Sequence, residues 1–211
     1  MAERETIGER PSGERPAARI GSVPNLLGIA RILATPVVAA LILVGTPGTG
    51  IAAFVVFVLA AITDFLDGWL ARRRDEVSPL GVFMDLTADK VLVAGVLVAM
   101  VEAGLTPTWM VATIVIRELV VSGVRQVAAA ADVVIPARPL GKAKTATTLV
   151  GMALLLLAFD AMTGGPLAGV VAADALEAVG FWTMVIATVL TVVSGWDYVS
   201  GSLPLLRGRV E

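Results

Sequence analysis

Ionisable residues lie inside long apolar stretches of this sequence. The acids among them are Asp64, Asp67, Asp85, Asp89, Glu118 and Asp197, and the bases are Arg31, Lys90, Arg117 and Arg125. A charged side chain is costly in hydrocarbon and commonly marks a substrate or ion pathway. A structural ion pair explains a single acid equally well, but four acids in one repeated pattern favour a functional site.

Two of the aspartates lie on one face of a predicted helix. Asp64 and Asp67 are three residues apart and therefore share a helical face. Gly68 and Ala71 continue the same face, and both residues are small. Small residues there permit close packing of helices, or they leave room for a nucleotide to lie against the backbone.

The other two aspartates lie on the next predicted helix, where Gly81, Asp85 and Asp89 follow one another at intervals of four residues. The connection 73–79 is short, so the two helices are predicted to be antiparallel neighbours whose aspartates face one cavity. Carboxylates this close would repel one another and take up protons unless a cation lies between them. Oxygen ligands favour Mg²⁺, Mn²⁺ or Ca²⁺ over zinc or copper. Two such ions about 3.5–4 Å apart would suit a displacement at phosphorus.

Composition places these residues in a membrane protein. Of 211 residues, 57% are hydrophobic and 16% are charged, and the mean hydropathy is +0.87. Soluble domains average about 45–50% apolar and about 25% charged residues. The net charge of −2 indicates no nucleic-acid partner. The chain has no cysteine and no histidine, which excludes disulfides, thiolate nucleophiles, Cys/His zinc sites and the commonest general base.

Six apolar segments approach the about 20 residues that a helix needs to cross a bilayer. They are 25–44, 51–72, 80–102, 108–131, 142–159 and 180–199. The sequence thus predicts an all-α integral membrane protein, a six-helix transmembrane bundle over residues 20–203. A disordered cytoplasmic tail, 1–19, precedes it and a short basic tail, 204–211, follows it. The segment 160–179 contains two glycines and a proline in succession and is predicted to be an outer loop with some interfacial helix.

The distribution of arginine and lysine predicts the orientation. Loops 45–50, 103–107 and 160–179 contain neither residue, whereas both tails and the other two connections contain arginine. Basic residues favour the cytoplasmic side. Both termini and the active site are therefore predicted to face the cytoplasm, from the inner (cytoplasmic) membrane. The four tryptophans and Tyr198 are expected to pack or to lie at the membrane interface rather than in the site.

The aspartate pattern resembles the signature of the CDP-alcohol phosphotransferase family at every fixed position. It is Asp64-x2-Asp67-Gly68-x2-Ala71-Arg72-x8-Gly81-x3-Asp85-x3-Asp89. The resemblance implies that the four aspartates hold two divalent ions, Mg²⁺ or Mn²⁺, and that Asp89 also serves as the general base. It further implies a homodimer and a CDP-binding set comprising Gly68, Ala71, Arg72, Ser78 and Gly81.

Further motifs narrow the resemblance within that family. The runs 23–27, 117–122 and 141–145 are similar to those of phosphatidylglycerophosphate synthases, although Ile116 stands where that group commonly has glycine. The resemblance implies transfer of the phosphatidyl group from CDP-diacylglycerol to sn-glycerol 3-phosphate, which releases CMP. The expected partners are these two substrates and membrane lipids.

An anionic acceptor would need a cationic pocket beside the metals. The available cations are Arg117, Arg125, Lys142 and Lys144. Each of them also has a simpler interpretation. Arg117 could form a structural pair with Glu118, and the others could set topology or contact anionic lipid head groups.

Two alternatives to this function stay open at the level of sequence. The first keeps the chemistry and changes the acceptor, as in a cardiolipin synthase, a phosphatidylserine synthase or a phosphatidylinositol phosphate synthase. The second is a cation or proton transporter that uses the four acids. The fixed glycines and Arg72 disfavour a transporter, because a transporter does not need a helix face of small residues that accommodates a nucleotide.

Overall fold

The structure is a computed structural model that describes the backbone of residues 23–74, 79–130 and 139–207, and the side chains of 26–63, 87–130 and 139–202. Within these ranges the chain forms six helices. They are α1 (Val23–Val44), α2 (Thr49–Arg74), α3 (Pro79–Glu102), α4 (Thr108–Ala130), α5 (Pro139–Met162) and α6 (Ala173–Arg207). The prediction of an all-helical chain is confirmed.

The helix ends differ most from the prediction at the two ends of α6, which ends at Arg207 rather than near residue 199 and so includes part of the predicted tail 204–211. α5 continues to Met162, and α6 begins at Ala173 rather than near residue 180. The prediction of some helix within the segment 160–179 agrees with this start of α6. Asp174 lies in the first turn of α6, where a carboxylate interacts favourably with the positive end of the helix dipole.

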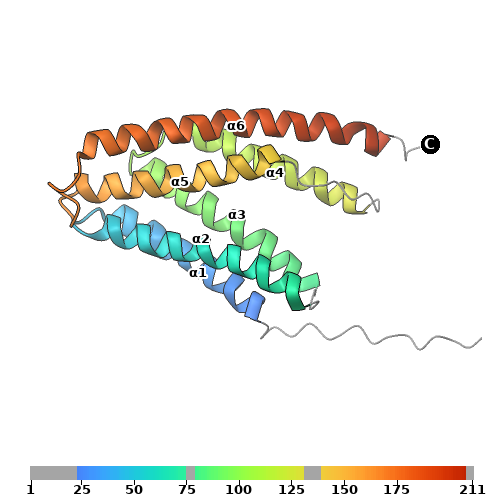
Figure 1. Ribbon diagram of the computed structural model, residues 1–211, viewed down its shortest axis with the longest axis horizontal. Coiled ribbons are helices and arrows are strands. Elements are labelled where there is room, and N and C mark those ends of the chain that lie inside the picture. The colour runs from blue at the N-terminus through green and yellow to red at the C-terminus, as the bar shows by residue number, and fades with distance from the viewer. Residues whose placement is uncertain (1–22, 75–78, 131–138, 208–211) are drawn as a thin grey trace, which may run out of the picture.

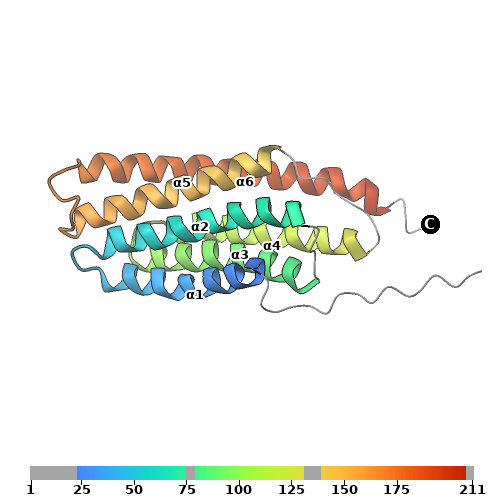
Figure 2. The same ribbon diagram turned by 60° about the horizontal axis from the view of Figure 1, so that its bottom comes forward.

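The helices form a bundle in which the chain turns back at each end. The connections α1–α2 and α5–α6 lie together at one end, and the C-terminal ends of α2, α4 and α6 point to the other (Figures 1 and 2). The paired glycines of these turns adopt the left-handed conformation, as at Gly45 and Gly164. The α3–α4 turn ends α3 with a Schellman motif, in which Gly104 has a φ of 74° and Leu105 donates to the Met100 carbonyl.

Three stretches of the described helices are long and apolar enough to cross a membrane. They are Leu26–Val44, Pro139–Met162 and Ala173–Ser202. Large apolar side chains such as Leu33, Leu119 and Trp196 are exposed along the bundle. An exterior of this kind is the surface expected of a protein whose solvent is lipid.

The interior is a single apolar cluster to which every helix contributes. Its members include Ile42, Phe57, Leu97, Met110, Leu155 and Met184. Glycines let neighbouring helices approach closely. A Cβ at Gly151 would lie 2.8 Å from the Met184 sulfur, and a Cβ at Gly180 would lie 2.9 Å from Leu155, so α5 and α6 touch through these two positions.

A buried acid connects the start of α2 to the α5–α6 connection. Asp160, in the last turn of α5, is 0% exposed. Its Oδ1 accepts from the Ile51 amide at 3.0 Å, and its Oδ2 accepts from the Leu167 amide at 3.1 Å. Ile51 belongs to the first turn of α2, whose dipole favours a carboxylate. The neighbouring Gly50 is so close that a Cβ there would lie 2.5 Å from the Asp160 nitrogen.

We expect Gly165→Ala to lower thermal stability, because a Cβ at this position would overlap the Asp160 carboxylate. Overpacking of this kind costs about 1–3 kcal/mol. The unfolding temperature in detergent should fall by several degrees, since about 1 kcal/mol corresponds to about 2–4 °C at this chain length. Gly123→Ala is the matched control, because a Cβ at that helical glycine would meet nothing within 4 Å. Equal unfolding temperatures of the two variants would show that the α5–α6 connection is not tightly packed around Asp160.

Candidate functional site

The predicted metal-binding aspartates lie on α2 and α3. Asp64 and Asp67 belong to the second half of α2, and Asp85 belongs to the first half of α3. Their side chains lie outside the described residues, as do those of Gly68, Ala71, Arg72, Ser78 and Gly81. The ligand set and the CDP-binding set therefore stay predictions. Asp89, the predicted general base, is the member of the signature whose side chain is described.

Asp89 faces a small cavity between α3, α4 and α5. The cavity measures about 60 Å³, and its polar walls include Lys90, Glu118 and Lys144. The rest of its lining is mostly apolar, for example Val93 and Ile114. The predicted base is thus placed beside one of the predicted acceptor cations, Lys144.

A larger cavity of about 550 Å³ adjoins the first. Both share part of their walls, including Lys90 and Glu118. The predicted acceptor cations Arg117, Arg125 and Lys142 all line the larger cavity. Arg117, Val121 and Arg125 follow one another at intervals of four positions, so all three lie on one face of α4. The structure therefore brings three cations from two helices to one space.

The charge of the larger cavity is strongly positive. Its described walls carry four cations, Lys90, Arg117, Arg125 and Lys142, and one acid, Glu118. Walls of one sign with apolar surroundings concentrate the electrostatic potential and attract a ligand of the opposite sign. An anion with several negative oxygens is the ligand class that fits this lining.

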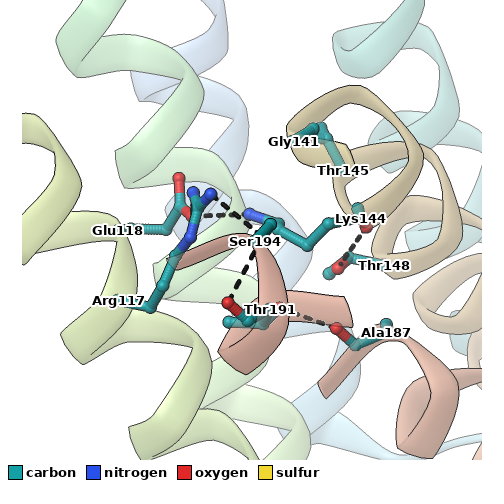
Figure 3. A network of polar contacts seen from close by, with 9 residues as sticks. All are labelled: Arg117, Glu118, Gly141, Lys144, Thr145, Thr148, Ala187, Thr191 and Ser194. Carbon is teal, nitrogen blue, oxygen red and sulfur yellow. Dashed lines mark hydrogen bonds and ion pairs between the residues drawn. The ribbon is translucent and has the colours of Figure 1, made fainter. Parts of the chain in front are cut away.

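Glu118 is the centre of a polar network that connects three helices (Figure 3). Its Oε1 accepts from Arg117 Nη1 at 2.8 Å and from Lys144 Nζ at 2.5 Å. Arg117 Nη2 donates to the Ser194 hydroxyl on α6 at 3.1 Å. The pairing of Arg117 with Glu118 that the sequence left open is therefore present, and it coexists with a place in the cavity wall.

The exposure of the cations follows their position in the bundle. Arg125 and Lys142 are exposed, the Arg117 side chain is 14% exposed, and Lys144 is 4% exposed. A buried ammonium needs a charged partner, because burying an unpaired ion is very costly. Glu118 supplies that partner for Lys144, and this contact fixes α4 against α5.

Comparison with known sequences identifies the family. The sequence model of the CDP-alcohol phosphatidyltransferase family matches residues 21–193. The chain belongs to this family. A protein of Bacillus subtilis (strain 168) named CDP-diacylglycerol–glycerol-3-phosphate 3-phosphatidyltransferase is 32% identical over 88% of this chain and 97% of its own. Proteins with the same name from Pseudomonas fluorescens and Cereibacter sphaeroides are 34% and 33% identical, over 90% and 88% of this chain and 95% and 97% of their own.

Several residues of the site had no assigned role in the sequence analysis of this phosphatidyltransferase. Lys90 and Glu118 were noted as charges inside apolar segments, which was the signal that could have placed them. Tyr198 was expected to pack or to lie at the interface, yet it is 4% exposed and lines the larger cavity. Nothing in the sequence indicated a role for Ser194, since a single serine in an apolar helix is common.

We expect Glu118→Gln to destabilise the protein, because it removes the charge that meets the buried Lys144 ammonium. A double-mutant cycle with Lys144→Met should give a coupling free energy of about 0.5–3 kcal/mol, as for residues in one ion-pair network. The measurement is thermal unfolding in detergent. Glu102→Gln is the matched control, because that acid is exposed and its substitution should change the free energy of unfolding by about 0.5 kcal/mol or less. Additive effects of Glu118→Gln and Lys144→Met would refute the pairing.

Proposed function

We propose that the protein transfers the phosphatidyl group of CDP-diacylglycerol to sn-glycerol 3-phosphate, giving phosphatidylglycerophosphate and CMP. The observation that carries this choice of acceptor is the larger cavity, whose wall contains Arg117, Arg125 and Lys142 and which adjoins the small cavity that Asp89 lines. A phosphate monoester is an anion that such a lining suits, since guanidinium and ammonium groups form strong, charge-assisted hydrogen bonds with phosphate oxygens. The names of the curated relatives support the same reaction.

The acidic residues fit a divalent metal. Asp64, Asp67, Asp85 and Asp89 offer carboxylate oxygens, and the chain has no histidine or cysteine that would favour a softer ion. These four residues would hold two ions, Mg²⁺ or Mn²⁺. When bound, such ions stabilise the negative charge that develops on phosphorus and on the departing CMP. Gly68, Ala71, Arg72, Ser78 and Gly81 would contact the CDP group.

The described residues perform the acceptor half of the reaction. Arg117, Arg125 and Lys142 bind the phosphate of glycerol 3-phosphate and orient its free primary hydroxyl towards Asp89. The Asp89 carboxylate takes the hydroxyl proton as that oxygen attacks the β-phosphorus, which bears the diacylglycerol. The new P–O bond forms as the bond to the α-phosphate oxygen breaks, and the electron pair leaves with CMP.

The setting of this reaction is proposed on the charge distribution. All six helices would span the inner (cytoplasmic) membrane, with both termini and the cavities on the cytoplasmic side. A homodimer is proposed on the family resemblance alone. The absence of lysine and arginine from loops 45–50, 103–107 and 160–179 supports this orientation. A reporter fused after Glu211 tests it, and a C-terminus found outside would refute it.

CMP release from CDP-diacylglycerol by the purified protein tests the reaction. We expect release with glycerol 3-phosphate and little with phosphatidylglycerol, serine or inositol phosphate. Asp89→Asn should lower the rate by at least about 100-fold, the lower range for losing a general base. Asp67→Asn should nearly abolish turnover, because it removes a predicted metal ligand. Asp174→Asn is the control, because that aspartate is exposed in the first turn of α6. Faster release with another acceptor would refute the proposed substrate, and metal flux into liposomes without CMP release would indicate a transporter.

The acceptor pocket makes a separate prediction. Neutralising Arg125 or Lys142 should raise the KM for glycerol 3-phosphate by about tenfold or more, because a hydrogen bond to a charged group contributes roughly 1.5–3 kcal/mol. The KM for CDP-diacylglycerol should barely change. Arg10→Gln removes the same charge from the predicted tail and serves as the control. Unchanged KM values with lower expression would mean that these cations only set the topology. An equal rise in the KM values for both substrates would place the cations at the nucleotide.

A further inference from the structure

Helix α6 forms one wall of the larger cavity, although its sequence carries no motif of the family signature. Ser194 and Tyr198 both line the cavity, and they are one helical turn apart. Both side chains are buried, at 3% and 4% exposure. This part of α6 lies alongside α4, whose Arg117 and Arg125 face the same space.

Two residues of α6 hold Arg117. Ser194 Oγ accepts from Arg117 Nη2 at 3.1 Å and donates in turn to the Thr191 carbonyl at 3.3 Å, which fixes the direction of the hydroxyl (Figure 3). The next residue, Gly195, leaves space for the arginine stem. A Cβ at Gly195 would lie 2.9 Å from Arg117 Cγ and 3.5 Å from Nε.

Tyr198 holds the second arginine. The Arg125 guanidinium carbon lies 5.8 Å from the centroid of the Tyr198 ring, within the range of a cation–π contact. The ring is buried whereas Arg125 is exposed, so the ring is the fixed member of the pair. α6 therefore contacts both arginines of the cavity, one through a hydroxyl and a glycine and the other through an aromatic face.

The spacing of the arginines explains why they need such support. Eight residues separate Arg117 from Arg125, which is about 12 Å along an α-helix. A single phosphate can meet both guanidinium groups only if the two side chains converge. Long side chains lose rotamer freedom when they bind a ligand, and holding them in advance reduces that loss. In the described hydrogen bonds, Arg117 uses two of its five N–H groups.

We propose that Ser194, Gly195 and Tyr198 are positioning residues that set the affinity for a phosphomonoester acceptor by holding Arg117 and Arg125 towards one phosphate. The inference rests on the proposed function, since it takes the larger cavity as the acceptor site. It assigns to α6 a role in acceptor recognition that does not involve contact with the nucleotide.

The first experiment compares the KM values of single variants in the CMP-release assay. Ser194→Ala, Gly195→Ala and Tyr198→Leu should each raise the KM for glycerol 3-phosphate about three- to tenfold, the effect of weakening one contact to a charged group. The KM for CDP-diacylglycerol and the rate at saturating acceptor should change less than twofold, about the scatter of such comparisons. Tyr198→Phe keeps the ring and should restore the low KM that Tyr198→Leu loses.

Matched controls separate positioning from general packing. Ser200→Ala removes a hydroxyl from an exposed serine of the same helix, and Gly123→Ala adds a methyl group on α4 where nothing lies within 4 Å. Neither should change the KM for glycerol 3-phosphate. An unchanged KM in the three α6 variants would overturn the inference. So would an equal rise in both KM values, or a loss of thermal stability with KM intact.

A second measurement needs no turnover. Glycerol 3-phosphate should raise the unfolding temperature of the wild-type protein, and the titration midpoint should move about three- to tenfold higher in the α6 variants, in proportion to the lost affinity. A wild-type protein that binds glycerol 3-phosphate without releasing CMP would refute the proposed reaction while leaving the α6 inference standing. Absence of both binding and CMP release would overturn both.

Discussion

The pairing of buried charges is the constraint on which the rest of this site depends. Lys144 is almost completely buried in an apolar bundle, and the Glu118 carboxylate is what makes that burial tolerable. The same carboxylate binds Arg117, which in turn donates to Ser194. One acid thereby links side chains of three helices, two of which, α5 and α6, also pack directly against each other at Gly151 and Gly180. The cavity walls on α4, α5 and α6 follow from that geometry, because the cations cannot move apart without leaving a charge unpaired.

The two ends of the bundle are built differently. At the end that holds the α1–α2 and α5–α6 connections, Asp160 accepts hydrogen bonds from the amides of Ile51 and Leu167, and glycines close the remaining space around it. At the other end the helices leave two adjoining cavities lined by charged residues. The tightly packed end fixes the directions of the helices. Residues at the other end can therefore keep their positions although a cavity lies between them. Binding sites are commonly supported by rigid elements in this way.

The sequence predicted the six helices because each is a long apolar run bounded by glycine, proline or charge. For the segment 160–179 the sequence predicted some helix but not its start at Ala173, although an acid such as Asp174 stabilises the first turn of a helix. Within α4, the spacing of the two arginines correctly predicted that they lie together, since Arg117 and Arg125 line the same cavity. The contributions of Ser194 and Tyr198 could not be predicted, because they depend on the rotation of α6 against α4, and a uniformly apolar helix does not specify its rotation. The aspartate set stays a prediction from the signature.

The order of exposure among the cations gives the cavity a direction. Arg125 and Lys142 are exposed, Arg117 is mostly covered, and Lys144 is buried beside the small cavity that Asp89 lines. An anion that enters from the exposed side meets the exposed charges of Arg125 and Lys142 first and the more buried charge of Arg117 later. Exposed cations in water hold an anion weakly, whereas partly buried ones act through a lower dielectric and hold it more strongly. Glu118 limits the attraction at the deep end by neutralising part of the positive charge there. This gradient would draw a phosphorylated acceptor inward towards Asp89, the predicted general base.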